Sequence, residues 1–184
     1  MKRACLRHFA IRLTIHDFSI HHIIMALHIA LYQPEIPANT GNIARTCAGT
    51  GTHLHLIRPL GFSTDDKMLK RAGLDYWPHV RIHYHDSLDD FVSGVETQKQ
   101  AQLYLIETYG TQAYSDFDFS QANTDYYFLF GRETKGLPED FARARAASCL
   151  RIPQSEHVRS LNLSNAAAIV IYEALRQRHF IDIA

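Results

Sequence analysis

Three short polar segments of this sequence carry the side chains best suited to bind a ligand and act on it. The last segment runs from Ile152 to Ala166, contains Arg159, Ser160 and Asn162, and leads into an Ala- and Ile-rich helical pattern. Serine and asparagine cap helix starts, where unpaired backbone N–H groups attract polar or anionic ligand groups. The segment therefore predicts a ligand site built from backbone donors and one cation, with a conventional helix cap as the alternative.

The second segment is Pro37 to Arg45, which contains Asn-Thr-Gly. Asn39 or Thr40 can cap a following helix, and Gly41 permits close approach of another backbone. We place Arg45 about one turn inside that helix, on the side of its start. A capped turn followed by a solvated arginine is an equally good interpretation of this segment alone.

The third segment, Gly131 to Pro138, has two glycines enclosing Glu133. This pattern is typical of a loop folded around a small molecule, although an ordinary charged loop also fits it. All three segments follow apolar runs that we interpret as strands, and the carboxyl ends of parallel strands meet at one edge of a sheet. We therefore expect the three segments to converge on one site.

The elements that position these segments alternate between apolar runs and helical patterns. Several runs are apolar on both faces, as in strands buried within a parallel sheet, so we predict an α/β fold with a mostly parallel sheet flanked by helices. The expected strands are Leu27 to Tyr32, Leu54 to Ile57, Val80 to Tyr84, Leu103 to Ile106, Tyr126 to Phe130 and Cys149 to Ile152. The expected helices are Gly41 to Thr50, Asp65 to Arg71, Leu88 to Val92, Glu139 to Ala146 and Asn162 to His179.

Composition predicts one globular domain in a reducing compartment. The chain has 184 residues, of which 46% are hydrophobic, and 19 basic residues balance 19 acidic ones. A nucleic-acid partner would therefore need a local basic patch. The three cysteines are widely spaced and form no CxxC pair, so we expect free thiols rather than disulfides. No apolar run approaches the roughly 18 to 20 residues of a membrane span.

Residues 1–24 differ from the rest because they are basic and their charges interrupt any signal-peptide core. Met25 stands directly before the first expected strand. We interpret residues 1–24 as a dispensable extension and residues 25–184 as the single domain. An arm that contacts RNA is the alternative.

The three segments resemble a known set of motifs. Asn39-x-Gly41-Asn42-x-x-Arg45, then Phe130-Gly131-x-Glu133-x-x-Gly136-Leu137-Pro138, then Ile152-Pro153 with Ser160 to Ala166 are similar to the ordered motifs of the SPOUT methyltransferases, in the ribose 2′-O branch. The similarity spans about Met25 to Phe180. The stretch Leu60 to Tyr76 also resembles the compact bacterial subgroup that acts on the tRNA wobble position.

The resemblance implies a fold and an activity that periodicity alone would not suggest. It implies a deep trefoil knot in the C-terminal part, although true knots are almost absent from proteins. It also implies a cytoplasmic homodimer whose active sites use both chains, with S-adenosyl-L-methionine as cofactor. The implied reaction is 2′-O-methylation of the wobble nucleotide, cytidine or modified uridine, in the anticodon stem-loop of tRNA, with leucine isoacceptors expected.

Motif matching also assigns residues. The cofactor would lie against Ile106, Gly131, Ile152 and Ser160, with backbone groups near Leu161 holding the adenine. Arg45 would stand beside the acceptor hydroxyl, with Asn39, Glu133 and Asn162 as orienting groups. A guanidinium stays protonated up to a pH of about 12, so we expect Arg45 to clamp a phosphate and stabilise the developing alkoxide rather than act as a base. The proton would leave through a phosphate oxygen, Glu133 or water.

RNA contact would come from a local basic patch, although each cation singly fits a solvated surface charge as well. Exposed aromatic side chains could stack on unpaired anticodon bases. The candidate cations are Arg58, Lys67, Lys70, Arg71, Arg132, Lys135 and Arg159, and the candidate aromatics are Tyr76, Trp77 and Tyr109.

The twelve histidines raise the question of a metal site. His53-x-His55 and His83-x-His85 each put two imidazoles on one strand face, but no nearby acid or cysteine completes a ligand set. We therefore expect exposed strand histidines and no metal. Cys47 lacks an obvious histidine partner and is a weak nucleophile candidate.

Three other functions fit parts of this pattern. They are an RNA-binding protein that has lost catalysis, a ribosomal RNA 2′-O-methyltransferase, and a flavodoxin-like nucleotide-binding protein. The intact Asn39, Arg45 and Glu133 count against the first of these.

Overall fold

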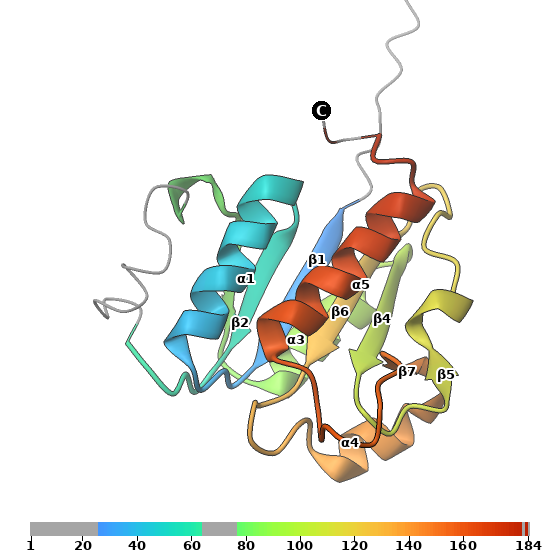
Figure 1. Ribbon diagram of the computed structural model, residues 1–184. Helices are drawn as coiled ribbons and strands as arrows, with labels where there is room; N and C mark the ends of the chain where they lie inside the picture. Colours follow the sequence, from blue (N-terminus) through green and yellow to red (C-terminus); the bar gives the residue numbers. More distant parts are fainter. Residues whose placement is uncertain (1–25, 64–76, 182, 184) are drawn as a thin grey trace, which may run out of the picture.

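Strands and helices alternate along the chain in the computed structural model, which describes residues 26–63, 77–181 and 183 (Figure 1). The strands are β1 (Leu27–Tyr32), β2 (His53–Ile57), β3 (Ile82–His85), β4 (Ala101–Ile106), β5 (Gln112–Ala113), β6 (Asp125–Phe130) and β7 (Cys149–Arg151). The α-helices are α1 (Pro37–Thr50), α3 (Leu88–Glu96), α4 (Glu139–Ala144) and α5 (Leu163–Gln177). Short 3-10 turns lie at Trp77–His79, Tyr114–Asp116 and Ala146–Ser148.

The seven strands form one sheet in the order β3-β2-β1-β6-β4-β7-β5, and every pairing between neighbours is parallel. β1 lies near the middle, between β2 and β6, and five of its six residues are buried. A strand covered on both faces is expected to be mostly apolar, and in β1 the exception is His28, which is also buried. The predicted α/β fold with a mostly parallel sheet flanked by helices is confirmed.

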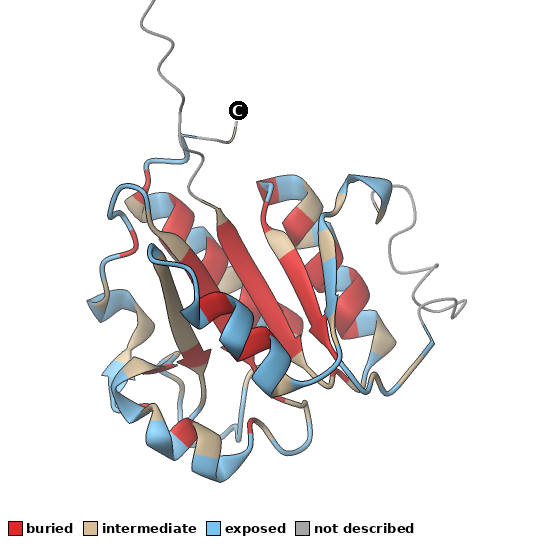
Figure 2. Ribbon diagram, turned by 180° about the vertical axis from the view of Figure 1, so that it is seen from behind, coloured by how far each residue is buried: buried red, intermediate tan, exposed pale blue. Residues whose placement is uncertain are grey.

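Helices cover both faces of this sheet. α1 and α5 lie together on one face, where Ile43 and Cys47 of α1 and Val170 and Ile171 of α5 join the core (Figure 1). α3 crosses the opposite face, and Phe91 belongs to a second core cluster there (Figure 2). The sheet therefore separates two apolar layers, and all parallel strands end on the same edge.

The start of α1 corrects one prediction. The helix begins at Pro37 rather than Gly41, and its N-cap residue Ile36 makes no side-chain cap. Proline suits the first helical position, because that position needs no N–H donor. Asn39 and Thr40 thus lie inside the first turn, and neither is the predicted cap.

The other helices agree more closely with the sequence. α5 begins after Asn162, and its apolar stripe is core, with Ala167 and Ile171 fully buried. α3 runs to Glu96, beyond the expected Val92, and the two-residue edge strand β5 was not predicted. The expected helix Asp65 to Arg71 and the extension 1–24 lie outside the described residues. No helix within residues 26–63 or 77–181 has the length and apolar character that crossing a membrane requires.

Candidate active site

A cavity of about 250 Å³ opens at the carboxyl ends of β4, β6 and β7. The segments that follow these strands form its wall. Its lining includes all five residues expected against the cofactor, which are Ile106, Gly131, Ile152, Ser160 and Leu161. Glu133 lines the same cavity. The structure thus brings these residues together from three separate stretches of sequence.

A chain of side-chain hydrogen bonds joins the three polar segments. Asn162 Nδ2 donates to Asn39 Oδ1 at 3.0 Å, and Asn39 Nδ2 donates to Glu133 Oε1 at 3.1 Å. Asn39 is buried, so both its amide oxygen and its amide nitrogen need these partners. The predicted convergence of the segments is confirmed for these residues.

Glu133 holds the start of α1. Its Oε2 accepts from the backbone N–H of Glu35 at 2.9 Å, and its Oε1 accepts from that of Ile36 at 3.2 Å. With Asn39 Nδ2, the carboxylate has three donors. A negative charge at a helix N-terminus also interacts favourably with the helix dipole. Glu133 therefore supplies from another loop the capping that no side chain of α1 provides.

The contact between these two loops is reciprocal. Glu35 accepts from both the backbone N–H and the hydroxyl of Thr134, at 3.1 and 2.8 Å to Oε2. The Thr134 side-chain hydrogen bond lowers the pKa of the Glu35 carboxyl. Each loop therefore offers a carboxylate to the backbone of the other, which fixes their relative position.

Two glycines let the loop after β6 fold back on itself. Arg132 and Gly136 pair backbone to backbone, and Gly136 has a φ of +67°. A Cβ added at Gly131 would lie 2.1 Å from the carbonyl carbon of Gly136, which is closer than two non-bonded carbon atoms can approach. The loop therefore depends on glycine at position 131, and this explains the Gly-x-Glu-x-x-Gly spacing in physical terms.

The start of α5 is capped as its sequence suggests. Asn162 Oδ1 accepts from the backbone N–H of Ser164 at 2.9 Å and of Asn165 at 3.4 Å. Because Asn162 also donates to Asn39, one amide both caps a helix and links two loops.

Arg45 is placed differently from the other expected catalytic residues. It is exposed, and it lies two turns into α1 rather than one. Asn39, Asn162 and Arg45 are all outside the cavity lining, but Asn39 and Asn162 are joined by hydrogen bonds to the lining residue Glu133. The earlier start of α1 accounts for the extra turn.

Several of the expected RNA-contacting residues lie at the cavity. Arg132, Lys135 and Arg159 line it, and so does the exposed Tyr109. Arg58 instead forms an ion pair with Asp86. Lys67, Lys70, Arg71 and Tyr76 lie outside the described residues. Trp77 is partly buried against the core, so it is less available for stacking on a base.

A lining residue that the sequence did not single out is Glu107, directly after β4. It belongs to no motif, and only its place at a strand end could have drawn attention to it. Its Oε1 accepts from the backbone N–H of Leu137 at 2.7 Å. Burial raises the pKa of Glu107.

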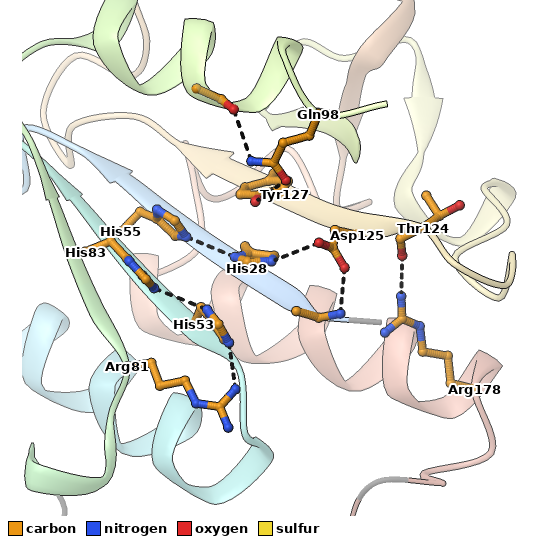
Figure 3. A network of polar contacts seen from close by, with 12 residues as sticks. His28, His53, His55, Arg81, His83, Gln98, Thr124, Asp125, Tyr127 and Arg178 are labelled. Atoms are coloured by element: carbon orange, nitrogen blue, oxygen red, sulfur yellow. Dashed lines mark hydrogen bonds and ion pairs between the residues drawn. The ribbon is translucent and has the colours of Figure 1, made fainter. Parts of the chain in front are cut away.

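The strand histidines form a hydrogen-bonded ladder on the α3 face of the sheet (Figure 3). His28 Nδ1 lies 2.9 Å from His55 Nε2, and His55 Nδ1 lies 2.9 Å from His85 Nε2. His53 and His83 form a second rung at 3.2 Å. Desolvation lowers the pKa of His28 to about 3 and that of His55 to about 2.

The ladder corrects the expectation of exposed strand histidines. His55 and His28 are buried, and only His83 of the five is exposed. Each link joins one protonated and one unprotonated nitrogen, so neutral imidazoles with a consistent tautomer satisfy the ladder.

Within the described part of the chain, no group of three or more His, Cys, Asp or Glu is arranged to hold a metal ion. Cys47 and Cys149 are buried free thiols, and desolvation raises the pKa of Cys47 to about 12, which argues against a nucleophile.

Comparisons with known proteins agree with this geometry. The family model described as the SpoU rRNA Methylase family matches residues 26–172. A Bacillus subtilis protein, provisionally named a tRNA (cytidine(34)-2′-O)-methyltransferase, is 61% identical over 160 residues, which are 87% of this chain and 98% of the relative.

Two solved structures are also similar. A structure described as giving insight into 2′-OH methylation of C/U34 on tRNA has 45% identity and a TM-score of 0.76, over 85% of this chain and 98% of that one. The Streptomyces viridochromogenes SpoU methyltransferase AviRb, in complex with AdoMet, has 26% identity and a TM-score of 0.74, over 84% of this chain and 58% of that one. The glycine-dependent loop and the converging polar segments agree with these matches. The matches show that this chain belongs to the SpoU methylase family.

Proposed function

We propose that this chain transfers a methyl group from S-adenosylmethionine to the ribose 2′-hydroxyl of the wobble nucleotide of tRNA, cytidine or modified uridine. The observation that carries the proposal is the cavity lined by two of the motif segments, to which the third is joined by the hydrogen bonds from Asn162 through Asn39 to Glu133. The names of relatives that match this chain along 98% of their own length support the same substrate.

The lining of the cavity suits this cofactor. Ile106, Ile152 and Leu161 offer apolar surface for an adenine ring, and Ser160 and loop backbone offer hydrogen bonds. When bound, S-adenosylmethionine supplies a methyl group made electrophilic by a sulfonium. It has no pyrophosphate, so the absence of Gly-x-Gly-x-x-Gly after the first strand is expected.

We assign positioning roles to three of the expected catalytic residues. The Glu133 carboxylate already accepts three hydrogen bonds, so its contribution is to hold the loops rather than to take the proton. Asn39 and Asn162 transmit this arrangement to the start of α5. The proton of the acceptor hydroxyl then leaves through a phosphate oxygen or water.

Arg45 would meet the acceptor nucleotide. Its guanidinium stays charged, so it can clamp a phosphate with two parallel hydrogen bonds and stabilise negative charge on the attacking oxygen. Because Arg45 is exposed on α1 and outside the cavity lining, we assign it to the cavity of a partner subunit in a homodimer.

The variant Arg45→Lys tests the clamp. A point charge replaces the planar fork, so we expect methyl transfer to a tRNA anticodon stem-loop to fall by about 10-fold or more, while affinity for S-adenosylmethionine measured by calorimetry stays unchanged. Arg176→Lys, at an exposed position of α5, is the matched control. A fully active Arg45→Lys enzyme would show that the fork has no role.

Mixing two inactive variants tests whether the sites are shared. Arg45→Ala has an intact cavity, and Gly131→Ala has an intact Arg45. If Arg45 acts across the dimer, mixed dimers contain one complete site and regain activity after subunit exchange. Size-exclusion chromatography with light scattering must show a dimer, and mixed dimers without any activity would place Arg45 in its own subunit.

The substrate and the location are tested in cells. We expect a cytoplasmic enzyme acting on leucine isoacceptors, and mass spectrometry of nucleosides from a deletion strain should show loss of the wobble 2′-O-methyl group from those tRNAs. Loss from ribosomal RNA instead would favour the ribosomal alternative.

The knot belongs to the same proposal. β7 follows β4 and β5 in sequence yet lies between them in the sheet, as expected if the chain passes back through earlier structure. We therefore expect the segments after β6 and β7 to form the deep trefoil knot. We likewise expect residues 25–184 to form a single SPOUT methyltransferase domain.

A further inference from the structure

Glu107 occupies a distinctive place in the cavity. It follows β4 directly, and its Oε1 is held by the backbone N–H of Leu137 at 2.7 Å. A Cβ at Gly136 would lie 3.0 and 3.1 Å from the two carboxylate oxygens, so the missing side chain at Gly136 leaves room for this group. The loop after β6 therefore packs against the Glu107 carboxylate at Gly136 and Leu137.

Among the residues that the structure describes, no cation forms an ion pair with the Glu107 carboxylate. Burial raises the pKa of Glu107, and backbone N–H groups of Leu137 and Thr108 oppose that effect. A partly buried carboxylate with only neutral donors is costly unless something else compensates its charge. Because Glu107 lines a ligand cavity, a positively charged group of the ligand is the natural partner.

We propose that Glu107 binds the α-ammonium group of the methionine part of S-adenosylmethionine. This inference rests on the proposed function. The ammonium is the one group of that molecule that combines positive charge with N–H donors. The sulfonium has charge but no donor, and the ribose hydroxyls have donors but no charge. The cations Arg132, Lys135 and Arg159 on the same lining remain for the α-carboxylate.

Calorimetry on the full chain with three ligands tests this assignment. S-Adenosylmethionine and S-adenosylhomocysteine both carry the ammonium, whereas 5′-methylthioadenosine keeps the adenine and ribose without the amino acid part. Glu107→Gln keeps the shape of the side chain and an oxygen for the Leu137 N–H. We expect it to weaken the first two ligands by about 10- to 100-fold and to leave 5′-methylthioadenosine unchanged.

Glu96→Gln is the control, because it removes one exposed negative charge on α3 and should change none of the three affinities. Three outcomes would overturn the assignment. Equal weakening of all three ligands would point to the ribose or to loop distortion, weakening of S-adenosylmethionine alone would point to the sulfonium, and unchanged binding would remove Glu107 from the site.

A measurement on the unaltered chain covers the case in which Glu107→Gln does not fold. N-Acetylated S-adenosylhomocysteine has lost the positive charge, and we expect it to bind about 10-fold or more weakly than the parent molecule. Equal binding of the two would contradict the assignment. If the unaltered chain binds neither S-adenosylmethionine nor S-adenosylhomocysteine, the proposed function itself fails.

Discussion

The histidine ladder should make this protein sensitive to mild acid. His28 and His55 are buried and neutral in the folded chain, with pKa values lowered by desolvation to about 3 and about 2 from an ordinary 6.5. Unfolding exposes both imidazoles to water, where they take up protons below pH 6.5. The unfolded state then binds more protons than the folded state, so stability is fully present above pH 6.5 and falls as the pH falls below it.

The size of the effect follows from these values. One pKa unit corresponds to about 1.4 kcal/mol, so at pH 5 each buried histidine lowers the free energy of unfolding by about 2 kcal/mol and the pair by about 4 kcal/mol. This is a large share of the roughly 5 to 15 kcal/mol that stabilises an ordinary domain. Between pH 6.5 and 5, we expect these two histidines to contribute a slope of about two protons, or nearly 3 kcal/mol per pH unit. The pKa values of His53, His83 and His85 are also lowered by desolvation, so these residues add to the slope in the same direction.

Urea unfolding followed by circular dichroism at several pH values between 7.5 and 5 measures this slope. The variant His55→Gln keeps hydrogen-bonding groups at the centre of the ladder but removes one titrating imidazole. We expect its slope to be smaller by about one proton. His157→Gln is the control, because this histidine is exposed and should leave the slope unchanged. The hydrogen-bonded carboxyl groups of Glu35, Asp118 and Glu173 have lowered pKa values and contribute at more acid pH.

Two results would refute this reasoning. One is a free energy of unfolding that changes by less than about 1 kcal/mol between pH 6.5 and 5. The other is a His55→Gln protein whose slope equals that of the unaltered chain, since the buried imidazole would then not be the group that titrates.

Four further predictions concern the site. Gly131→Ala should abolish detectable S-adenosylmethionine binding in calorimetry, because the added Cβ would overlap the backbone of Gly136. Asn162→Ala should lower the free energy of unfolding in urea by about 1 kcal/mol through loss of the α5 cap, and should reduce methyl transfer because Asn39 loses a partner. Affinity for an anticodon stem-loop, measured by fluorescence anisotropy, should fall steeply as salt rises if cavity cations contact phosphates. A chain beginning at Met25 should methylate tRNA at the full-length rate, and loss of activity would favour the RNA-contacting arm.

Much of the fold was predictable because its signals are local. Apart from His28 and Asp125, the residues of β1 and β6 are aliphatic or aromatic on both faces, as expected inside a sheet covered on both sides. The resemblance to the SPOUT family is confirmed. β5 was not predicted because a strand of two residues shows no periodicity. The predicted start of α1 was wrong because the carboxylate of Glu133, which is distant in sequence, accepts hydrogen bonds from the backbone at the start of the helix.

Convergence of the site could be predicted, but its contacts could not. Parallel topology alone requires the ends of β4, β6 and β7 to meet. Which group Glu133 would bind depends on how two loops fold against each other, and no motif records that. The ladder depends on the register of three strands, since His55 stands opposite His83 only in the observed pairing. Glu107 was missed for the same reason, because its significance lies in the Leu137 N–H it accepts.

The pairing of β1 with β6 bears on how the protein is made. Leu27 stands opposite Tyr126, so one edge of this apolar strand stays open until about 100 further residues have left the ribosome. β2 can close the other edge early, but about 70 residues separate the end of β2 from β6, which takes roughly 3 to 14 s of translation. During that interval a bare, hydrophobic strand edge invites aggregation. Depletion of a nascent-chain chaperone should therefore reduce the yield of soluble enzyme, even if the free energy of unfolding of the folded protein is high.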